Sequence, residues 1–372
     1  MLKVVFVLLG VCSAIFGSEV RYLSPPNISG DVVLQQVTCN RPMRKPSPRI
    51  ELEEREGKLL VHNYGHGGAG WSLSYGSVKY AHDCLPKNLS KDVPIAVVGA
   101  GCIGLLTAYN LLKEGFGNIT LYAEKAADLA SHHAGGLLSF RASTPSKDVN
   151  ETLLQICEET YSFYKQIALG NNSDFPKGAR IIPTYFQTIH DSEVEDLVGR
   201  CIEPAKDVIV DFQNGVKREM IVYDDTVFID TFHMMSTLNS LLEDTVLLQQ
   251  RRIDSFDQCR EKVIFNCSGL GARHLCQDNN VYPVLGHLAL LKNQDIHSLS
   301  YMMIVNFQSE PDGVIRTLDF FPKQLADRSD SNVGVFGGTF IEDPSKTNDE
   351  REFKKLFERA FYFYNNKEYD CD

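Results

Sequence analysis

The stretch Val97-Val98-Gly99-Ala100-Gly101-Cys102-Ile103-Gly104 decides the fold of this chain, because it places a Gly-x-Gly-x-x-Gly turn between a strand and a helix. Residues 95–98 are an apolar run typical of a buried strand, and residues 105–113 have helical spacing. Gly99 permits the tight turn, Gly101 lets the backbone approach a pyrophosphate, and Gly104 allows close packing of helix on strand. The helix N-terminus then offers free N–H groups to phosphates.

A second strand over residues 119–123 ends at Glu124, where an acid is expected to meet a ribose hydroxyl. Strand, glycine turn, helix, strand and acid in this order predict a dinucleotide-binding unit. The alternative is a glycine-rich turn that binds no nucleotide. The unit is unusually placed, because residues 1–93 precede it.

The composition allows two domains and argues against one class of partner. A chain of 372 residues is long enough for two cores. The formal net charge of −11 disfavours nucleic acid, which selects a basic face.

The first residues predict a secretory signal peptide. Met1-Leu2-Lys3 precedes an apolar run over residues 4–16, which is too short to span a membrane comfortably. We therefore expect a signal over residues 1–18, a secreted protein and no membrane segment after cleavage. A buried N-terminal strand is the alternative. The C-terminus gives no support to a peroxisomal location.

Ten cysteines fit a secreted protein only loosely. Cys102 and Cys267 are expected to be buried thiols. The disulfide candidates, with pairing open, are Cys39, Cys84, Cys157, Cys201, Cys259, Cys276 and Cys371. The paired histidines His132 and His133 are expected in an ordinary loop, and we predict no metal site.

A second glycine-rich segment, His62-Asn63-Tyr64-Gly65-His66-Gly67-Gly68-Ala69-Gly70-Trp71-Ser72, lies near the front of the chain. It suits backbone lying against a flat ligand, or the turn before a helix over residues 74–84. A glycine-rich surface loop is the alternative. Before it we expect a strand over residues 31–37, a rigid proline-containing connector over 39–46, and a hairpin turning at Glu56-Gly57.

The remaining pattern mixes helices with a second sheet. We expect helices over residues 148–169, 229–248 and 350–364, and strands over 180–187, 208–220, 284–291, 301–307, 314–321 and 333–340. Residues 262–272 again read as a buried strand followed by a glycine turn.

From the glycine turn onward the chain resembles the D-amino-acid oxidase and D-aspartate oxidase family. The matching pieces are residues 97–104, Tyr122-Ala123-Glu124, residues 131–137, residues 251–256, Asn266-Cys267-Ser268-Gly269-Leu270-Gly271 and Gly337-Gly338-Thr339. The resemblance implies an α/β fold, in which a Rossmann-type FAD-binding domain accompanies a second, mainly antiparallel α+β substrate domain.

The family carries an Arg-Pro-x-Arg segment and a His-x-Tyr-Gly-His-Gly-Gly-x-Gly motif in its last quarter, whereas here they come first, as residues 41–44 and 62–70. The chain therefore reads as circularly permuted, or as a gene model that joined two tandem copies. The expected division is signal 1–18, substrate domain 19–61, FAD domain 62–147, substrate domain 148–224, FAD domain 225–280 and substrate domain 281–372.

The resemblance implies an oxidase whose FAD takes a hydride from a D-amino acid and passes electrons to dioxygen. Arg41 matches the family arginine that holds the substrate α-carboxylate. The positions that match the family's FAD contacts are Gly67, Gly68, Ala69, Gly70, Trp71, Ser72, Gly99, Gly101, Cys102, Ile103, Gly104, Glu124, Ser131, Gly135, Gly136, Leu137, Ile253, Ser268 and Gly269.

Two departures affect the expected substrate. Asp319 stands where the family has a substrate-binding tyrosine, and Tyr301 is a weaker substitute. The family's second arginine, which would bind an acidic side chain, has no counterpart over residues 301–306, so Arg316 is the candidate. We expect D-amino acids, acidic ones such as D-aspartate or D-glutamate foremost, as substrates. Oxidation of glycine or N-methyl amino acids, and a catalytically silent flavoprotein, are the alternatives.

Overall fold

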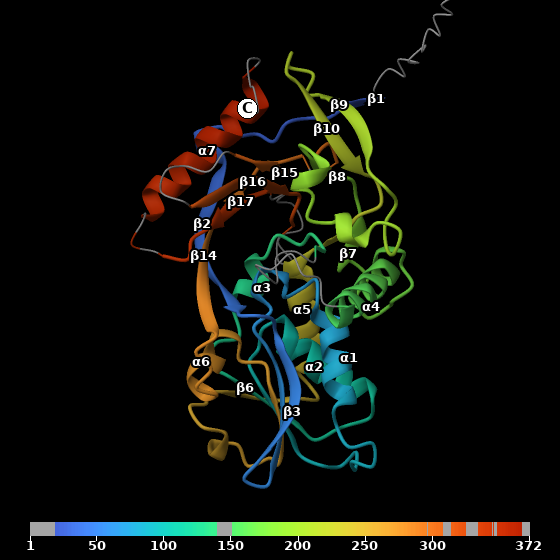
Figure 1. The fold of residues 1–372 in the computed structure, drawn as a ribbon, viewed down its shortest axis with the longest axis vertical. Coiled ribbons are helices and arrows are strands. Elements are labelled where there is room, and N and C mark those ends of the chain that lie inside the picture. The colour runs from blue at the N-terminus through green and yellow to red at the C-terminus, as the bar shows by residue number, and fades with distance from the viewer. Residues whose placement is uncertain are drawn as a thin grey trace, which may run out of the picture.

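The computed structural model describes residues 19–139, 151–295, 297–307, 314–324, 334–343, 345 and 348–366. Two sheets lie one above the other along the long axis of the molecule, the larger toward α7 and the smaller toward α6 (Figure 1). This arrangement confirms the predicted α/β class with a second, mainly antiparallel sheet.

The smaller sheet has the strand order β12-β6-β5-β13-β4-β3. All neighbours are parallel except the edge pair β3 and β4. Its strands are β3 (Arg49–Arg55), β4 (Lys58–Tyr64), β5 (Ile95–Val98), β6 (Ile119–Ala123), β12 (Leu247–Gln250) and β13 (Val263–Asn266).

Four helices pack beside this sheet and share its apolar core (Figure 1). They are α1 (Ser74–Asp83), α2 (Cys102–Lys113), α4 (Glu151–Ala168) and α5 (Thr231–Leu242). The buried strand β5 is apolar at all four positions because both of its faces are covered. Short helices α3 (Ala130–His133) and α6 (Ala272–Leu275) follow β6 and β13.

The larger sheet has the strand order β1-β9-β10-β8-β15-β16-β17-β14-β2, and α7 (Asp349–Asn365) packs against it. Its strands are β1 (Glu19–Tyr22), β2 (Val33–Arg44), β8 (Thr184–Phe186), β9 (Lys206–Asp211), β10 (Lys217–Tyr223), β14 (Val281–Leu291), β15 (Met302–Asn306), β16 (Ile315–Phe321) and β17 (Val335–Phe340). A separate pair joins β7 (Ala179–Ile181) to β11 (Val227–Ile229).

The N-terminal segment belongs to both sheets. Strand β2 pairs along its whole length with β14, and β4 lies parallel beside β13. Strand β3 already belongs to the smaller sheet, so that sheet begins at Arg49 rather than at the predicted boundary between residues 61 and 62.

Several predicted elements differ from the structure. The predicted strand over 208–220 is the hairpin of β9 and β10, and the predicted loop at His132 and His133 is the end of the short helix α3. The predicted connector over residues 39–46 is largely the second half of β2, where Pro42 is tolerated because β2 is an edge strand. The predicted helix over 229–248 ends at Leu242, and the chain turns into β12. The predicted strand over 180–187 splits into β7 and β8, and Pro183 lies in the break.

The disulfide prediction fails for the part of the chain that the structure describes. Its eight cysteines are all free thiols, and Cys102 and Cys267 are buried as predicted. Cys371 and the expected signal over residues 1–18 lie outside the described residues. No described helix is both long enough and apolar enough to cross a membrane.

Candidate functional site

The glycine turn has the close contacts that its motif predicts. Gly99 has φ +112°, and a Cβ there would lie 2.4 Å from the Cys267 carbonyl oxygen. A Cβ on Gly104 would lie 1.8 Å from the Gly99 carbonyl oxygen. Helix α2 therefore begins directly against β5 and β13, with Gly101 as its N-cap.

A cavity of about 750 Å³, here called the edge cavity, opens where the parallel strands end. It lies beside β5, between β6 and β13, where the strand order reverses and α/β sheets bind ligands. Glu124 lines it as an exposed side chain, with its carboxylate 3.9 Å from the Arg252 guanidinium. The other predicted residues on its wall are Gly99, Gly101, Ser131, Ile253, Ser268 and Gly269.

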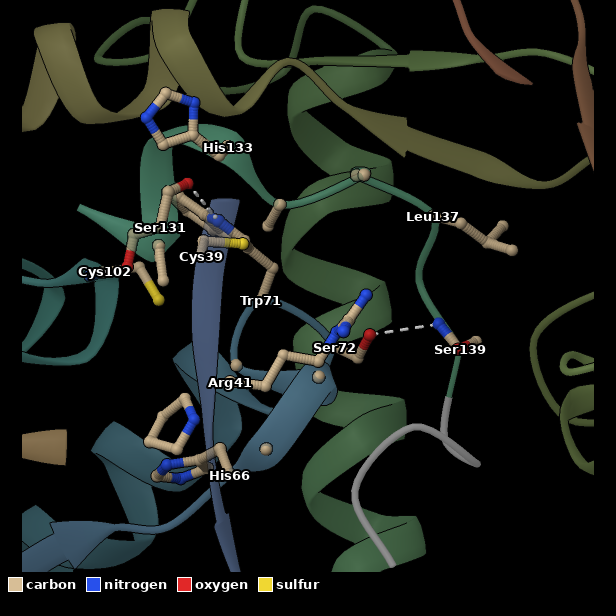
Figure 2. A pocket seen from close by; sticks show the side chains of 18 of the residues that line it. Cys39, Arg41, His66, Trp71, Ser72, Cys102, Ser131, His133, Leu137 and Ser139 are labelled. Carbon is tan, nitrogen blue, oxygen red and sulfur yellow. Dashed lines mark hydrogen bonds between the residues drawn. The ribbon is translucent and has the colours of Figure 1, made fainter. Parts of the chain in front are cut away.

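A second cavity of about 210 Å³, here called the inner cavity, lies between the two sheets (Figure 2). The predicted residues on its wall are Arg41, Gly67, Gly68, Gly70, Trp71, Ser72, Gly101, Cys102, Ile103, Ser131, Gly135, Gly136, Leu137 and Gly269. Ala69 is instead buried in the core. Among the predicted residues, the two cavities share Gly101, Ser131 and Gly269, so an extended dinucleotide can occupy both.

Hydrogen bonds join the three segments that form the inner cavity. The Trp71 Nε1–H donates to the Ser131 carbonyl oxygen at 2.9 Å, and the Cys102 amide donates to Ser131 Oγ at 2.9 Å. The Ser139 amide donates to Ser72 Oγ at 3.0 Å, as Figure 2 shows. The segment that precedes α1 is thereby fixed against the glycine turn although 30 residues separate Gly101 from Trp71.

Buried polar atoms on the wall of the inner cavity have no hydrogen-bond partner. They are Asn63 Oδ1, His66 Nε2 and His133 Nδ1. Burial lowers the pKa of His66 to about 4, so its ring is neutral. A flat heteroaromatic ring with donors and acceptors at its edge fits such a wall, because buried polar groups otherwise cost free energy. The site prediction named none of these three residues, although Asn63 and His66 lie inside the glycine-rich segment.

Arg41 presents a guanidinium to the same cavity from β2. Its Nη1–H donates to the Thr339 carbonyl oxygen at 2.9 Å, and its Cζ lies 4.1 Å from the centre of the Phe340 ring. A Cβ on Gly286 would lie 2.6 Å from Arg41 Nη1, so this glycine makes room for the side chain. Arg41 forms no ion pair with any described carboxylate. Burial lowers its pKa, but arginine stays charged, so the guanidinium can bind an anion.

Two carboxylates line the inner cavity as well. Asp319 Oδ1 accepts a hydrogen bond from Thr317 Oγ1 at 2.7 Å. Burial, followed by the nearby Glu193 carboxylate, raises the pKa of Asp319 to about 7. Glu193 Oε2 accepts a hydrogen bond from Ser139 Oγ at 3.0 Å. No sequence signal pointed to Glu193, because it lies in a loop without a motif.

The structure places Arg316 and Tyr301 away from this cavity, so it gives no support to their predicted substrate roles. Arg316 is buried and forms a two-pronged ion pair with Glu352 of α7, with N–O distances of 2.7 and 2.8 Å. Tyr301 is buried in the core of the larger sheet, and its hydroxyl donates to the Ser24 carbonyl oxygen at 2.8 Å. Neither side chain lines the inner cavity.

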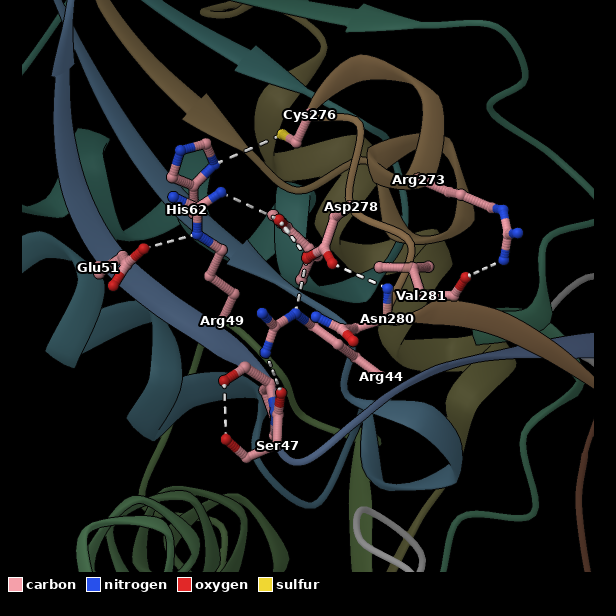
Figure 3. Close-up of polar contacts among 12 residues, drawn as sticks. Arg44, Ser47, Arg49, Glu51, His62, Arg273, Cys276, Asp278, Asn280 and Val281 are labelled. Carbon is pink, nitrogen blue, oxygen red and sulfur yellow. Dashed lines mark hydrogen bonds and ion pairs between the residues drawn. The ribbon is translucent and has the colours of Figure 1, made fainter.

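A polar network connects β2 and β4 to Asp278, in the segment after α6 (Figure 3). Arg44 Nε donates to Asp278 Oδ2 at 2.7 Å, and the Tyr64 hydroxyl donates to the same oxygen at 2.9 Å. Burial, followed by Arg49, lowers the pKa of His62 to about 4. The network ties the β3–β4 hairpin to the segment after α6. Among the described residues, no group of three or more His, Cys, Asp or Glu side chains could hold a metal ion.

Comparisons with known proteins agree with this geometry. The family model described as FAD dependent oxidoreductase matches residues 94–370. A D-amino-acid oxidase of Dictyostelium discoideum is 24% identical over 219 residues, which cover 56% of this chain and 59% of that protein. A D-aspartate oxidase of Cryptococcus neoformans is 35% identical over 71 residues, or 18% of each chain. A D-amino-acid oxidase of Rubrobacter xylanophilus is 47% identical over 57 residues, covering 15% of this chain and 17% of that protein.

The chain thus matches no more than about three fifths of the length of these relatives. Among solved structures, glycine oxidase from Geobacillus kaustophilus has a TM-score of 0.47 at 14% identity, covering 68% of this chain and 74% of the other. L-Proline dehydrogenase from P. horikoshii has a TM-score of 0.49 at 13% identity, covering 74% and 77%.

The two joined cavities fit the cofactor of the matched family. The edge cavity carries the glycine turn and Glu124 for the nucleotide half, and the inner cavity carries the orphaned polar atoms for the ring. The matched region covers the glycine turn and extends to the end of α7. The chain belongs to the FAD-dependent oxidoreductase family of the D-amino-acid oxidases, and its cofactor is FAD.

Proposed function

We propose that the protein is an oxidase that converts D-amino acids, dioxygen and water into 2-oxo acids, ammonia and hydrogen peroxide. The observation that carries this proposal is the Arg41 guanidinium, which lines the inner cavity without an ion-pair partner among the described residues. FAD, when bound, supplies the hydride acceptor and the route of electrons to dioxygen.

The protein's own part in this reaction is to bind and orient. The Arg41 fork holds the α-carboxylate by charge-assisted hydrogen bonds, which fixes the direction of the α-hydrogen. Thr339 and Phe340 hold the guanidinium in place through its Nη1–H and its flat face. The apolar wall contributed by Leu137 and Ile304 excludes water from the reacting centre.

The expected preference for acidic D-amino acids has little support. Arg316 is held by Glu352, and Arg41 is the one permanently cationic side chain among the described residues of the inner-cavity wall. Asp319 and Glu193 line the same wall and would repel a second carboxylate. Neutral D-amino acids are therefore the better first substrates, and a silent flavoprotein is the outcome if none reacts.

The function is tested with purified, FAD-loaded protein. D-Alanine should release hydrogen peroxide and L-alanine should not. Arg41→Ala should lower kcat/KM about 100-fold, the loss expected for charge-assisted hydrogen bonds to a carboxylate, while the flavin absorbance is retained. Arg200→Ala is the matched control, because this arginine pairs with Glu158 at an exposed site and should change kcat/KM less than 2-fold. A flavin-loaded protein without peroxide release from any D-amino acid would contradict the proposal.

We further propose that the chain is a secreted, circularly permuted member of its family. The permutation is supported by the pairing of β2 with β14 and of β4 with β13, which makes residues before the matched region part of both sheets. Secretion is supported by the charged start and apolar run within residues 1–18. N-terminal sequencing of protein recovered from the medium of expressing eukaryotic cells tests the signal.

A further inference from the structure

Asp319 and Arg41 both line the inner cavity, and each lies beside the strand β17. Asp319 on β16 is paired with Gly337 on β17, and Arg41 Nη1 donates to the carbonyl oxygen of Thr339, two residues further along β17. Residues two apart on a strand are about 6.5 Å apart. An anionic and a cationic group therefore share one short stretch of cavity wall.

Two glycines of β17 line the inner cavity beside these two groups. Gly337 and Gly338 both line the inner cavity, so these positions of β17 place no side chain between the carboxylate and the guanidinium. Gly338 has φ +129°, a conformation that favours glycine, and a Cβ there would lie 2.3 Å from the Thr317 carbonyl oxygen. Glycine at this position therefore allows β17 to pack closely against β16.

The Asp319 carboxylate retains capacity for a ligand. Thr317 engages Oδ1, and among the described residues no cation lies within ion-pairing distance of Asp319. Glu193 adds a second negative charge nearby. An isolated carboxylate in such a place gains free energy when a cationic donor binds it, because both groups are removed from water.

We propose that Asp319 binds the α-ammonium group of a zwitterionic amino acid whose α-carboxylate is held by Arg41. An α-amino acid carries its carboxylate and its ammonium on one carbon, so the two groups can each form a hydrogen bond with one of two partners on the same short stretch of wall. The substrate class is therefore the monocarboxylic α-amino acid. This inference rests on the proposed function, since it assigns a second contact in the same site.

The test uses two probes that the FAD-loaded enzyme cannot oxidise, because neither of them carries both an α-hydrogen and an α-amine. α-Aminoisobutyrate is a zwitterion without an α-hydrogen, and isobutyrate has the same carboxylate without the ammonium. Dissociation constants are measured at pH 8 from the change in flavin absorbance. The wild-type protein should bind α-aminoisobutyrate about 10-fold more tightly than isobutyrate, and Asp319→Asn should reduce this ratio to about 2-fold or less.

Asp83→Asn is the matched control, because Asp83 is the exposed last residue of α1 and pairs with the exposed Lys87, so this change should leave the ratio unchanged. Equal affinities in the wild-type protein, or an unchanged ratio in Asp319→Asn, would overturn the proposal. 5-Aminovalerate carries its ammonium group far from its carboxylate. If Asp319→Asn weakens the binding of 5-aminovalerate more than the binding of α-aminoisobutyrate, the carboxylate binds a side-chain cation and the assignment is wrong. Absence of peroxide release with D-alanine, while the ratio persists, would refute only the oxidase function.

Discussion

Arg316 and Glu352 form the buried charge pair whose removal should affect stability rather than substrate choice. Both side chains are almost fully buried, and the guanidinium makes two hydrogen bonds to the carboxylate. Arg316→Gln should lower the free energy of unfolding by about 3–5 kcal/mol, because it leaves the Glu352 charge buried without its main partner. Urea unfolding measures this loss, and kcat/KM for D-alanine in the folded fraction should stay within about 2-fold.

The double change Arg316→Met with Glu352→Leu is the control, because it removes both charges and should recover most of the lost stability. A selective rise in KM for D-aspartate in Arg316→Gln, with unfolding unchanged, would instead return Arg316 to the substrate site.

The sequence identified Arg41 through its motif but misplaced Arg316. Strand side chains alternate between faces, so Asp319 and Arg316, three residues apart on β16, point to opposite sides of a regular strand. The pairing of β16 with β17 shifts register between these residues, so alternation alone does not place the two side chains. The contacts place Arg316 against Glu352 of α7 and Asp319 on the wall of the inner cavity. One of the two could line the cavity, and the sequence alone did not show which face of β16 meets α7. Glu193 lies in a loop and His133 ends the four-residue helix α3, and no periodicity specifies either position.

Among the elements, the contact between β5 and α2 depends most directly on a glycine. A Cβ on Gly104 would lie 1.8 Å from the Gly99 carbonyl oxygen, which is backbone and cannot rotate away. Gly104→Ala should therefore move the N-terminus of α2 away from the edge cavity and weaken FAD binding by about 100-fold, as expected when several phosphate hydrogen bonds are lost. Titration of the apoprotein with FAD, followed by flavin fluorescence, measures the change.

Gly117→Ala is the matched control, since nothing lies within 4 Å of a Cβ at that loop position. It should leave the dissociation constant of FAD unchanged. Wild-type FAD affinity in Gly104→Ala would mean that the turn does not hold the pyrophosphate.

Local sequence signals specified some elements and missed others. The β3–β4 hairpin was predicted around Glu56-Gly57, and in the structure these two residues have the positive φ values, 53° and 75°, that a tight hairpin turn needs. The continuation of β2 through Pro42 was missed, because it depends on pairing with β14, a strand more than 200 residues away. Likewise β12 continues the apolar pattern of α5 and becomes a strand only through its pairing with β6.

At the scale of the whole molecule, the contacts that form the two sheets do not depend on the order of the segments along the chain. Strand β2 pairs with β14, and β4 with β13, so both sheets depend on these contacts whichever segment comes first. Helix α7 packs against β14, and Val33 at the start of β2 pairs with Leu291 at the end of β14. The end of the described chain therefore lies near the N-terminal segment at the same end of the molecule (Figure 1).

A rearranged chain tests this directly. Residues 93–366 would come first, followed by a flexible Gly/Ser linker of about 20 residues, which spans roughly 25 Å, and then residues 19–85. Because a change in loop length alters closure free energy by only about 1 kcal/mol, the rearranged protein should fold, bind one FAD and melt within about 5 °C of the original. Calorimetry and flavin absorbance measure both properties. Residues 93–366 alone are the control and should not bind FAD, since they lack β4 and the glycine-rich segment of the inner cavity. Failure of the rearranged chain to bind FAD, while the original order binds it, would show that the segment order is required for the fold.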